Sequence, residues 1–380
     1  MTHRERFTAV VTRGKSDRAV YDLCGTGQTT VDSRAIAEKM AEILKIDGYN
    51  PGGYNIDVRI LDALDIDTRA VGGRPVPETK RQRTENGIMY DSWGIGYKQV
   101  ADHGESVSYP LEGLAIDEIM DYEFPDPAKN NPGIYSEWAS QAEFLHWSTD
   151  FAVVAVSPFF GVFELGCFLF GFEDFLYRLA AEPELVHCFF RKVLEYQKKN
   201  IDLYFDAVGR HIDCVTLTDD MGTQAGPFIS SKMFDEMVKP YFKEMVCYLR
   251  KYTDAFVELH SCGSVYSLIQ GFIDCGVDIL NPIQPNAHMM ECERLKNDFG
   301  SKICFWGGID TQRLLPNGTA DDVKTEVKKM LAAMEGCGYV LSPAHTIQHD
   351  VPAENVAAIY MGAREYYSCT GQYGCKPCNA

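Results

Sequence analysis

Eight short apolar runs, most of them followed by a pattern typical of an amphipathic helix, organise the chain. They predict strands at Ala19–Leu23, Thr68–Val71, Ala152–Val156, Cys214–Leu217, Ala255–His260, Val277–Leu280, Ile303–Trp306 and Tyr339–Leu341. The predicted helices cover about 33–45, 134–146, 173–181, 183–208, 230–250, 265–271, 289–298, 320–335 and 352–366. Alternating strands and helices predict parallel pairing through right-handed crossovers. Eight such units predict a (β/α)₈ TIM-type barrel, with a doubly wound sheet as the alternative.

One region departs from this alternation. Residues 74–113 are polar and rich in Gly, Tyr and Trp, and they predict a β-hairpin with Asn86-Gly87 at or near a turn. We interpret the region as an excursion from a single barrel domain, residues 1–368, which a cysteine-containing tail, 369–380, follows. The aromatic part of the excursion, Trp93 to Tyr109, either covers the mouth of the barrel or packs elsewhere on it.

Composition and charge exclude several classes of partner. The 380 residues carry a formal net charge of −18, which repels nucleic acid and anionic membrane surfaces.

The sequence shows neither a signal peptide nor a membrane span. The segment Met1 to Lys15 has no apolar core typical of a signal peptide. The most apolar stretch, 151–172, is interrupted by Pro158 and Gly161, so it predicts a strand and a buried helix instead of a membrane span. We expect a cytoplasmic protein.

Thirteen cysteines, an odd number scattered through apolar segments, indicate reduced thiols instead of a disulfide framework. Three of them, Cys369, Cys375 and Cys378, cluster in the tail. The C-x-x-C pair there either binds a second metal or belongs to a mobile tail with free thiols.

The fifth predicted strand ends in a possible ligand pair. Residues two apart in an extended chain point to the same side, so His260 and Cys262 place an imidazole and a thiol together at the strand end. Zinc prefers nitrogen and sulfur ligands, at roughly 2.0 to 2.3 Å from the metal. The alternative is a hydrogen-bonded histidine beside an ordinary core cysteine.

Polar residues also follow the remaining predicted strands, and in a barrel the carboxyl ends of the strands meet at one opening. Asp219 and Asp220 follow the fourth strand, where they suit a metal carboxylate, a general base or a substrate clamp. Capping of the next helix is the alternative, although that helix is predicted to begin near residue 230. Asp310 follows the seventh strand and suits a catalytic role or a turn.

Amide side chains at the same strand ends suit the orientation of a ligand. Gln284 follows the sixth strand and is a candidate catalytic residue, while Asn281 and Gln224 are candidate substrate-binding residues. Asn281-Pro282 is also a plain turn signal.

His345 follows the last strand and is the candidate third zinc ligand, with His349 as a substitute. Three protein ligands leave the fourth position of zinc open, which distinguishes a catalytic zinc from a structural one.

Five segments in the same order resemble the uroporphyrinogen decarboxylase superfamily, and within it the corrinoid-dependent methyltransferases. They are TDDMGTQAGPFISSKMFDEMVKPYFKEM from Thr218, HSCGSV from His260, GVDILNPIQPNA from Gly276, FGSKICFWGGIDTQRLLPNGT from Phe299 and SPAHTIQHDVPAENV from Ser342. The resemblance is strong over about 210–366 and weak in the N-terminal half.

The resemblance implies a (β/α)₈ barrel and a zinc site whose ligands fall on His260, Cys262 and position 345. The better known methyltransferases have Cys at the third position, whereas this chain has His345, a harder and less electron-donating ligand. A site with one thiolate activates a thiol substrate less strongly.

The resemblance also implies a reaction and a partner. We expect a zinc-dependent methyltransferase that moves a methyl group between a small O-, N- or S-methyl compound, or an acceptor, and a corrinoid. The corrinoid is expected on a separate protein because the chain has no cobalamin-binding D-x-H-x-x-G motif. Decarboxylation of a tetrapyrrole is the alternative. We place it second to methyl transfer because the segment Cys24 to Thr30 lacks the arginines that hold the substrate carboxylates in true decarboxylases. The same residues also suit a paralogue without activity that binds a corrinoid or a tetrapyrrole, or a protein whose zinc is structural.

Overall fold

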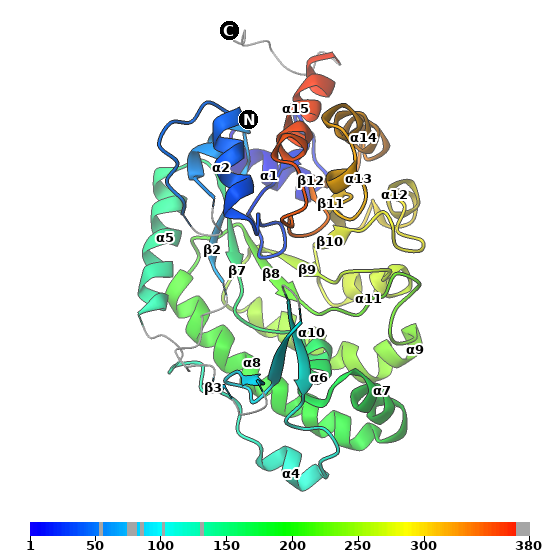
Figure 1. The fold of residues 1–380 in the computed structure, drawn as a ribbon. Coiled ribbons are helices and arrows are strands. Elements are labelled where there is room, and N and C mark those ends of the chain that lie inside the picture. Colours follow the sequence, from blue (N-terminus) through cyan, green and yellow to red (C-terminus); the bar gives the residue numbers. More distant parts are fainter. Residues whose placement is uncertain (53–55, 74–81, 84–86, 101–102, 130–132, 370–380) are drawn as a thin grey trace.

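The barrel predicted from the alternation of strands and helices is present. The computed structural model describes residues 1–52, 56–73, 82–83, 87–100, 103–129 and 133–369. Eight parallel strands pair in the order β1-β12-β11-β10-β9-β8-β7-β2 (Figure 1). Their bounds are β1 Val20–Tyr21, β2 Thr68–Gly72, β7 Ala152–Val156, β8 Cys214–Thr218, β9 Phe256–His260, β10 Ile279–Ile283, β11 Cys304–Ile309 and β12 Tyr339–Pro343.

Several strands extend further toward the carboxyl end than the sequence predicts. Strand β10 continues through Asn281 to Ile283, and β11 continues through two glycines to Ile309. The apolar pattern ends earlier because Asn281 in β10 and Gly307 and Gly308 in β11 interrupt it, while the backbone ladder continues past them. The sequence therefore places the loops two or three residues too early.

Helices cover the outside of the barrel in the expected order. Those that the sequence predicts are α2 Arg34–Ile43, α5 Ile134–Ser148, α7 Phe172–Ala181, α8 Pro183–Val208, α10 Lys239–Leu249, α11 Ile269–Asp274, α12 Cys292–Phe299, α14 Ala320–Ala333 and α15 Ala353–Cys369. The buried helix expected after the third predicted strand is α6, Val162–Phe170. Short helices add α3 Val58–Ala63, α4 Ile116–Asp121, α9 Ser231–Met233, a π-helical turn Phe234–Val238, a 3₁₀ turn Tyr266–Leu268 and α13 Leu314–Asn317. Within the described residues, no helix combines the length and apolar character needed to cross a membrane.

A helix that the sequence pattern did not predict, α1 (His3–Val11), closes the amino end of the barrel. Its N-terminus has a capping box in which Thr2 and Glu5 satisfy each other's backbone amides. Phe7 is fully buried and packs edge-on against Trp306 of β11, with ring centroids 6.0 Å apart. The helix therefore fills the bottom of the barrel, opposite the carboxyl ends of the strands.

Asp67 joins the first and last strands of the sheet. Its backbone N–H donates to the carbonyl of Tyr21, and its carboxylate accepts the N–H of Tyr21 at 2.7 Å. Arg6, Arg18 and His3 also donate to this fully buried carboxylate. Burial alone raises the pKa of Asp67, but these partners outweigh burial and hold the pKa below its usual value.

The excursion forms its own antiparallel sheet, β3-β4-β5-β6, with bounds β3 Gln82–Arg83, β4 Met89–Tyr90, β5 Gly96–Val100 and β6 His103–Ser108. Trp93, between β4 and β5, packs against Phe124, Phe160 and Tyr196. Tyr196 belongs to α8, so this part of the excursion contacts a helix on the outside of the barrel. Gly87 adopts φ = 75°, as the predicted turn requires, whereas Asn86 lies outside the described residues. The tail cysteines Cys375 and Cys378 lie outside them as well.

Candidate metal centre

His260, the last residue of β9, is held in one ring orientation. The side chain is 2% exposed, and its Nδ1 lies 2.6 Å from Oδ1 of Asn281, its in-register neighbour on β10. Because an amide oxygen accepts, Nδ1 of His260 carries the proton and Nε2 keeps its lone pair. A histidine that donates one ring N–H to a fixed acceptor and presents the other nitrogen is typical of a metal ligand.

Asp220 joins the histidine and the cysteine. Its Oδ1 accepts the backbone N–H of Cys262 at 2.8 Å and lies 3.7 Å from Nε2 of His260. One ligand atom from each of Asp220, His260 and Cys262 lies within 4.8 Å of the others, and this is the one such group of three among the described residues. Carboxylate, imidazole and thiol together form a set of zinc ligands.

The chemistry of this group fits a divalent cation. Burial raises the pKa of the Cys262 thiol, and the negative charge of Asp220 and its hydrogen bond to the thiol raise it further. Without a cation, the carboxylate therefore disfavours the thiolate beside it. A bound zinc ion reverses this effect, because coordination deprotonates the thiol.

His345 lies beside this group. Its ring centroid is 5.7 Å from that of His260. The side chain remains exposed, yet the protein atoms around the ring, and then the neighbouring His260, lower the pKa of His345 to about 4. At neutral pH the ring is uncharged. The role of His345 as third ligand stays a prediction. The same holds for its substitute His349, which is exposed and is not among the described residues that line the cavity.

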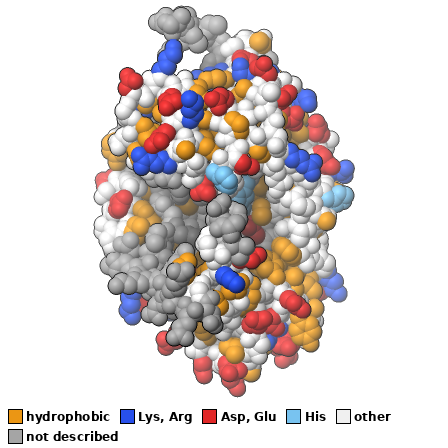
Figure 2. All heavy atoms as spheres, viewed as in Figure 1, with side chains coloured by type: hydrophobic (Ala, Val, Ile, Leu, Met, Phe, Trp, Pro, Cys, Tyr) orange, Lys and Arg blue, Asp and Glu red, His pale blue; other side chains and the backbone are white. Residues whose placement is uncertain are grey.

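A cavity of about 430 Å³ opens next to the group. Its described lining consists of Gly222, Thr223, Gln224, Cys262, Gly263, Gln284, Pro285, Asn286, Asp310, Thr311, Gln312, Ala344 and His345. Five of the residues that the sequence singles out therefore border one space. The space-filling view shows histidine surface with acidic side chains beside it near the centre of this face (Figure 2).

Close contact between two loops shapes the cavity floor. Thr223, after β8, and Ser264, after β9, form an isolated antiparallel bridge. A Cβ atom on Gly222 would lie 2.4 Å from the carbonyl oxygen of Cys262, and Gly263 has φ = 82°. Only glycine allows this approach, so the two glycines hold Cys262 at the cavity wall.

Asp219 is separate from the cavity. It is fully buried, and its Oδ1 accepts the N–H of Glu164 at 2.7 Å, at the amino end of α6. A Cβ atom on Gly161 would lie 2.0 Å from Cγ of Asp219, so glycine there makes room for the carboxylate. Burial, and to a lesser extent the charge of Glu164, raise the pKa of Asp219 well above its usual value. Asp219 thus caps α6, a helix that lies earlier in the chain. The alternative that the sequence suggested was capping of the helix that follows Asp219.

Two further candidates on the cavity wall make backbone contacts. Oε1 of Gln284 accepts the N–H of Gly263 at 2.7 Å and so supports the loop that carries Cys262. The carboxylate of Asp310 accepts backbone N–H groups of Gln312, Arg313 and Leu314, as expected of a residue that stabilises a turn. Their predicted catalytic roles stay predictions.

Gln224 lies on the cavity wall and Asn281 does not. The backbone carbonyl of Gln224 accepts from His288, and the residue is exposed. Asn281 is fully buried, and its Nδ2 has no hydrogen-bond partner among the described residues. A substrate contact by either residue stays a prediction.

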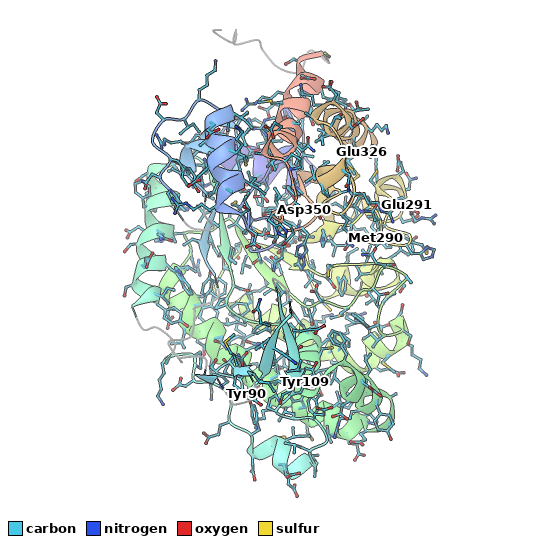
Figure 3. The ribbon with its side chains drawn as sticks, viewed as in Figure 1. Tyr90, Tyr109, Met290, Glu291, Glu326 and Asp350 are labelled. Atoms are coloured by element: carbon cyan, nitrogen blue, oxygen red, sulfur yellow. The ribbon has the colours of Figure 1, made fainter. Side chains whose placement is uncertain are left out.

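The sequence reasoning missed several wall residues, namely Thr223, Asn286, Thr311 and Gln312. They belong to the same loops as the predicted residues, and their position after a strand was the one available signal. The sticks view labels Met290 and Glu291 in the loop that follows β10, and Asp350 in the segment between β12 and α15 (Figure 3).

The sequence matches one known family model over most of its length. The family model "Uroporphyrinogen decarboxylase (URO-D)" matches residues 91–366, which include every candidate site residue. The chain belongs to the uroporphyrinogen decarboxylase family. No curated protein matches the sequence.

One solved structure shares the fold of this chain, and two others are more distant matches. A methyltransferase from Methanosarcina mazei has a TM-score of 0.69 and 15% identity, over 97% of this chain and 99% of that chain. At this identity the likeness shows the fold. A GH113 β-1,4-mannanase covers 90% of this chain and 98% of its own at 12% identity and a TM-score of 0.38. The match to an L-ribulose 3-epimerase covers 70% of this chain and 95% of that chain, also at 12% identity and a TM-score of 0.38.

Proposed function

We propose that this URO-D family member is a zinc-dependent methyltransferase of the cytoplasm. It moves a methyl group between a small methylated substrate or acceptor and a corrinoid carried by a separate protein. The observation that carries the proposal is the group of Asp220, His260 and Cys262, whose donor atoms lie within 4.8 Å of one another beside a cavity. The fold likeness to a methyltransferase supports it.

His260 and Cys262 would hold the metal, with the third donor from Asp220 or from His345. When bound, zinc supplies Lewis acidity that lowers the pKa of a substrate oxygen, nitrogen or sulfur atom. Asn281 fixes the ring of His260 through the 2.6 Å hydrogen bond, and Gln284 supports the Cys262 loop through Gly263. These two hydrogen bonds would thus hold the metal ligands in place.

The transfer balances with one proton. In the direction of methylation, the methyl group moves as the equivalent of CH₃⁺ to the lone pair of the heteroatom, and its former bonding pair stays on the corrinoid. The heteroatom loses its proton to solvent water in the open cavity, whose wall includes the exposed His345. Amide and hydroxyl side chains around the cavity orient the substrate, among them Gln224 and Thr311.

A methyl-transfer assay tests the proposal. The zinc-loaded protein is mixed either with methylcobalamin and a panel of thiols, phenols and amines, or with reduced cobalamin and methanol, methylamines, aryl methyl ethers and methyl thiols. We expect a change in the cobalamin absorption spectrum with at least one compound, and loss of the change in His260→Ala. Asp350→Asn, an exposed aspartate outside the described cavity lining, is the control.

Tetrapyrrole decarboxylation is the second candidate, because the family model carries that description. The described cavity lining has one acidic residue, Asp310, and no lysine or arginine to hold substrate carboxylates. Release of CO₂ from a tetrapyrrole polycarboxylate by the wild type, with no methyl transfer to any compound of the panel, would replace the methyltransferase proposal with this one.

A further inference from the structure

The pairing of β8 with β9 fixes where Asp220 lies. Thr218 and His260 are in-register partners, so the residues two positions later, Asp220 and Cys262, leave their strands side by side. The hydrogen bond from the N–H of Cys262 to Oδ1 of Asp220 continues this register beyond the strand ends. The backbone of two neighbouring strands therefore brings this carboxylate to the cysteine.

His345 reaches the same region from a more distant strand. It follows β12, which is three places from β9 in the sheet, and the N–H of Ala344 is bound to the carbonyl of Ile309 on β11. Its ring lies near His260 but does not join the described group of mutually close donors. Unlike Asp220, it lines the cavity.

From these contacts, and on the basis of the proposed function, we infer that Asp220 is the third protein ligand of the zinc ion and that His345 faces the substrate. The ligand set is then one imidazole, one thiolate and one carboxylate. This ligand set differs from the one that the sequence predicts, which has two imidazoles and one thiolate. It also differs from a set with one imidazole and two thiolates.

The charge of the ligand set bears on the substrate. Two anionic ligands balance the two charges of zinc, whereas two histidines and one thiolate leave a net charge of +1. A neutral centre adds no electrostatic attraction for an anionic substrate, and the described cavity lining offers no lysine or arginine either. The site therefore suits uncharged substrates, such as alcohols, simple thiols or amines in their neutral form, over those with carboxylate or sulfonate groups.

X-ray absorption at the zinc edge tests the inference on the wild-type protein. The spectrum distinguishes sulfur from lighter ligands and counts imidazoles through their multiple scattering. We expect one sulfur and one imidazole, with oxygen in the remaining positions. Two imidazoles with one sulfur would overturn the inference.

Paired variants give a second readout. We expect Asp220→Asn to weaken zinc binding by at least about 100-fold. Loss of a residue that only hydrogen-bonds to a metal ligand weakens binding by up to about 100-fold, so a larger loss indicates a direct ligand. His345→Gln should bind zinc as the wild type does, and Asp350→Asn controls for the loss of one exposed negative charge. Zinc affinity is measured by competition with a chromophoric chelator, after circular dichroism has verified folding. Normal affinity in Asp220→Asn together with weak binding in His345→Gln would overturn the inference.

The outcomes separate the inference from the proposed function. A wild type that binds zinc through two imidazoles and transfers methyl groups refutes the role of Asp220 alone. A wild type that binds no zinc refutes both. If Asp220→Asn fails to fold, Asp220→Glu and the wild-type absorption spectrum still decide the question, because the longer carboxylate retains an oxygen ligand.

Discussion

At the scale of single residues, Asn281 sets the tautomer of His260. We predict that Asn281→Leu weakens zinc binding by about 10- to 100-fold, as loss of an outer hydrogen-bond partner of a ligand histidine does. Asn281→Asp keeps an oxygen acceptor at the same place and should retain most of the affinity. Zinc affinity measured by chelator competition checks this. Equal affinity of the leucine variant and the wild type would contradict the role of Asn281.

Gly161 makes room for Asp219 at the start of α6. Because a Cβ atom there would lie 2.0 Å from the carboxyl carbon, we predict that Gly161→Ala lowers the free energy of unfolding by about 1–3 kcal/mol. Gly133→Ala is the matched control, since no atom of the described residues lies within 4 Å of an added Cβ there. Urea denaturation of both variants gives the comparison. Equal destabilisation of the two would refute the close contact.

The sequence could predict which residue types stand at the strand ends, but not their individual contacts. The sequence singled out His260, Cys262 and His345 as candidates because they stand at or shortly after the ends of predicted strands. The closeness of Asp220 to the pair depends on the register of β8 with β9, which a single sequence does not encode in its apolar pattern. The burial of Asp219 depends on Gly161, 58 positions earlier in the chain.

At the scale of elements, α1 fills the amino end of the barrel. We predict that Phe7→Ala lowers the free energy of unfolding by about 3–5 kcal/mol, because the ring is fully buried against Trp306. Phe144→Ala, with a side chain 61% exposed on α5, should change it little. Thermal or urea unfolding distinguishes the two. A small effect of Phe7→Ala would show that α1 contributes little to the barrel.

The joint between β1 and β2 depends on the charge of Asp67. We predict that Asp67→Asn destabilises the protein by about 3 kcal/mol, because Arg6 and Arg18 lose their buried counter-charge. The folded pKa of Asp67 is depressed below the unfolded value of about 3.9, so its contribution is present above that pH. The contribution is lost as the pH falls through the folded pKa.

Denaturation curves at several pH values check this sign. The difference in unfolding free energy between wild type and Asp67→Asn should be constant near neutral pH and shrink below about pH 4. A difference that grows on acidification would contradict the depressed pKa.

Elements with strong apolar periodicity were predictable, and those held by tertiary contacts were not. All eight barrel strands were predicted, although several end two or three residues later than expected, because buried parallel strands consist mostly of continuous apolar runs. Helix α1 was missed because its polar residues Arg4, Glu5 and Arg6 obscure a short apolar face. The excursion was predicted as a hairpin, and β5 and β6 do pair antiparallel. The sequence did not show that β3 and β4 extend this pair into a larger sheet.

At the scale of the whole molecule, the barrel gathers residues that are far apart in the chain. Asp220, His260, Cys262 and His345 lie at the carboxyl ends of three strands or in the loops that follow them, and the family match spans all four residues. A metal that binds the folded chain and not the unfolded one stabilises the folded state. Chelation should therefore lower the melting temperature of the wild type and leave that of Cys262→Ala unchanged.

The most direct test of the account is the metal content of the purified protein, measured by elemental analysis without prior exposure to chelators. Wild type, His260→Ala, Cys262→Ala and the Asp350→Asn control are compared. We predict about one zinc ion per chain in the wild type and the control, and a loss of zinc in the two ligand variants. Absence of zinc from the wild type, or its retention in both ligand variants, would contradict the proposed metal centre and the methyl transfer that depends on it.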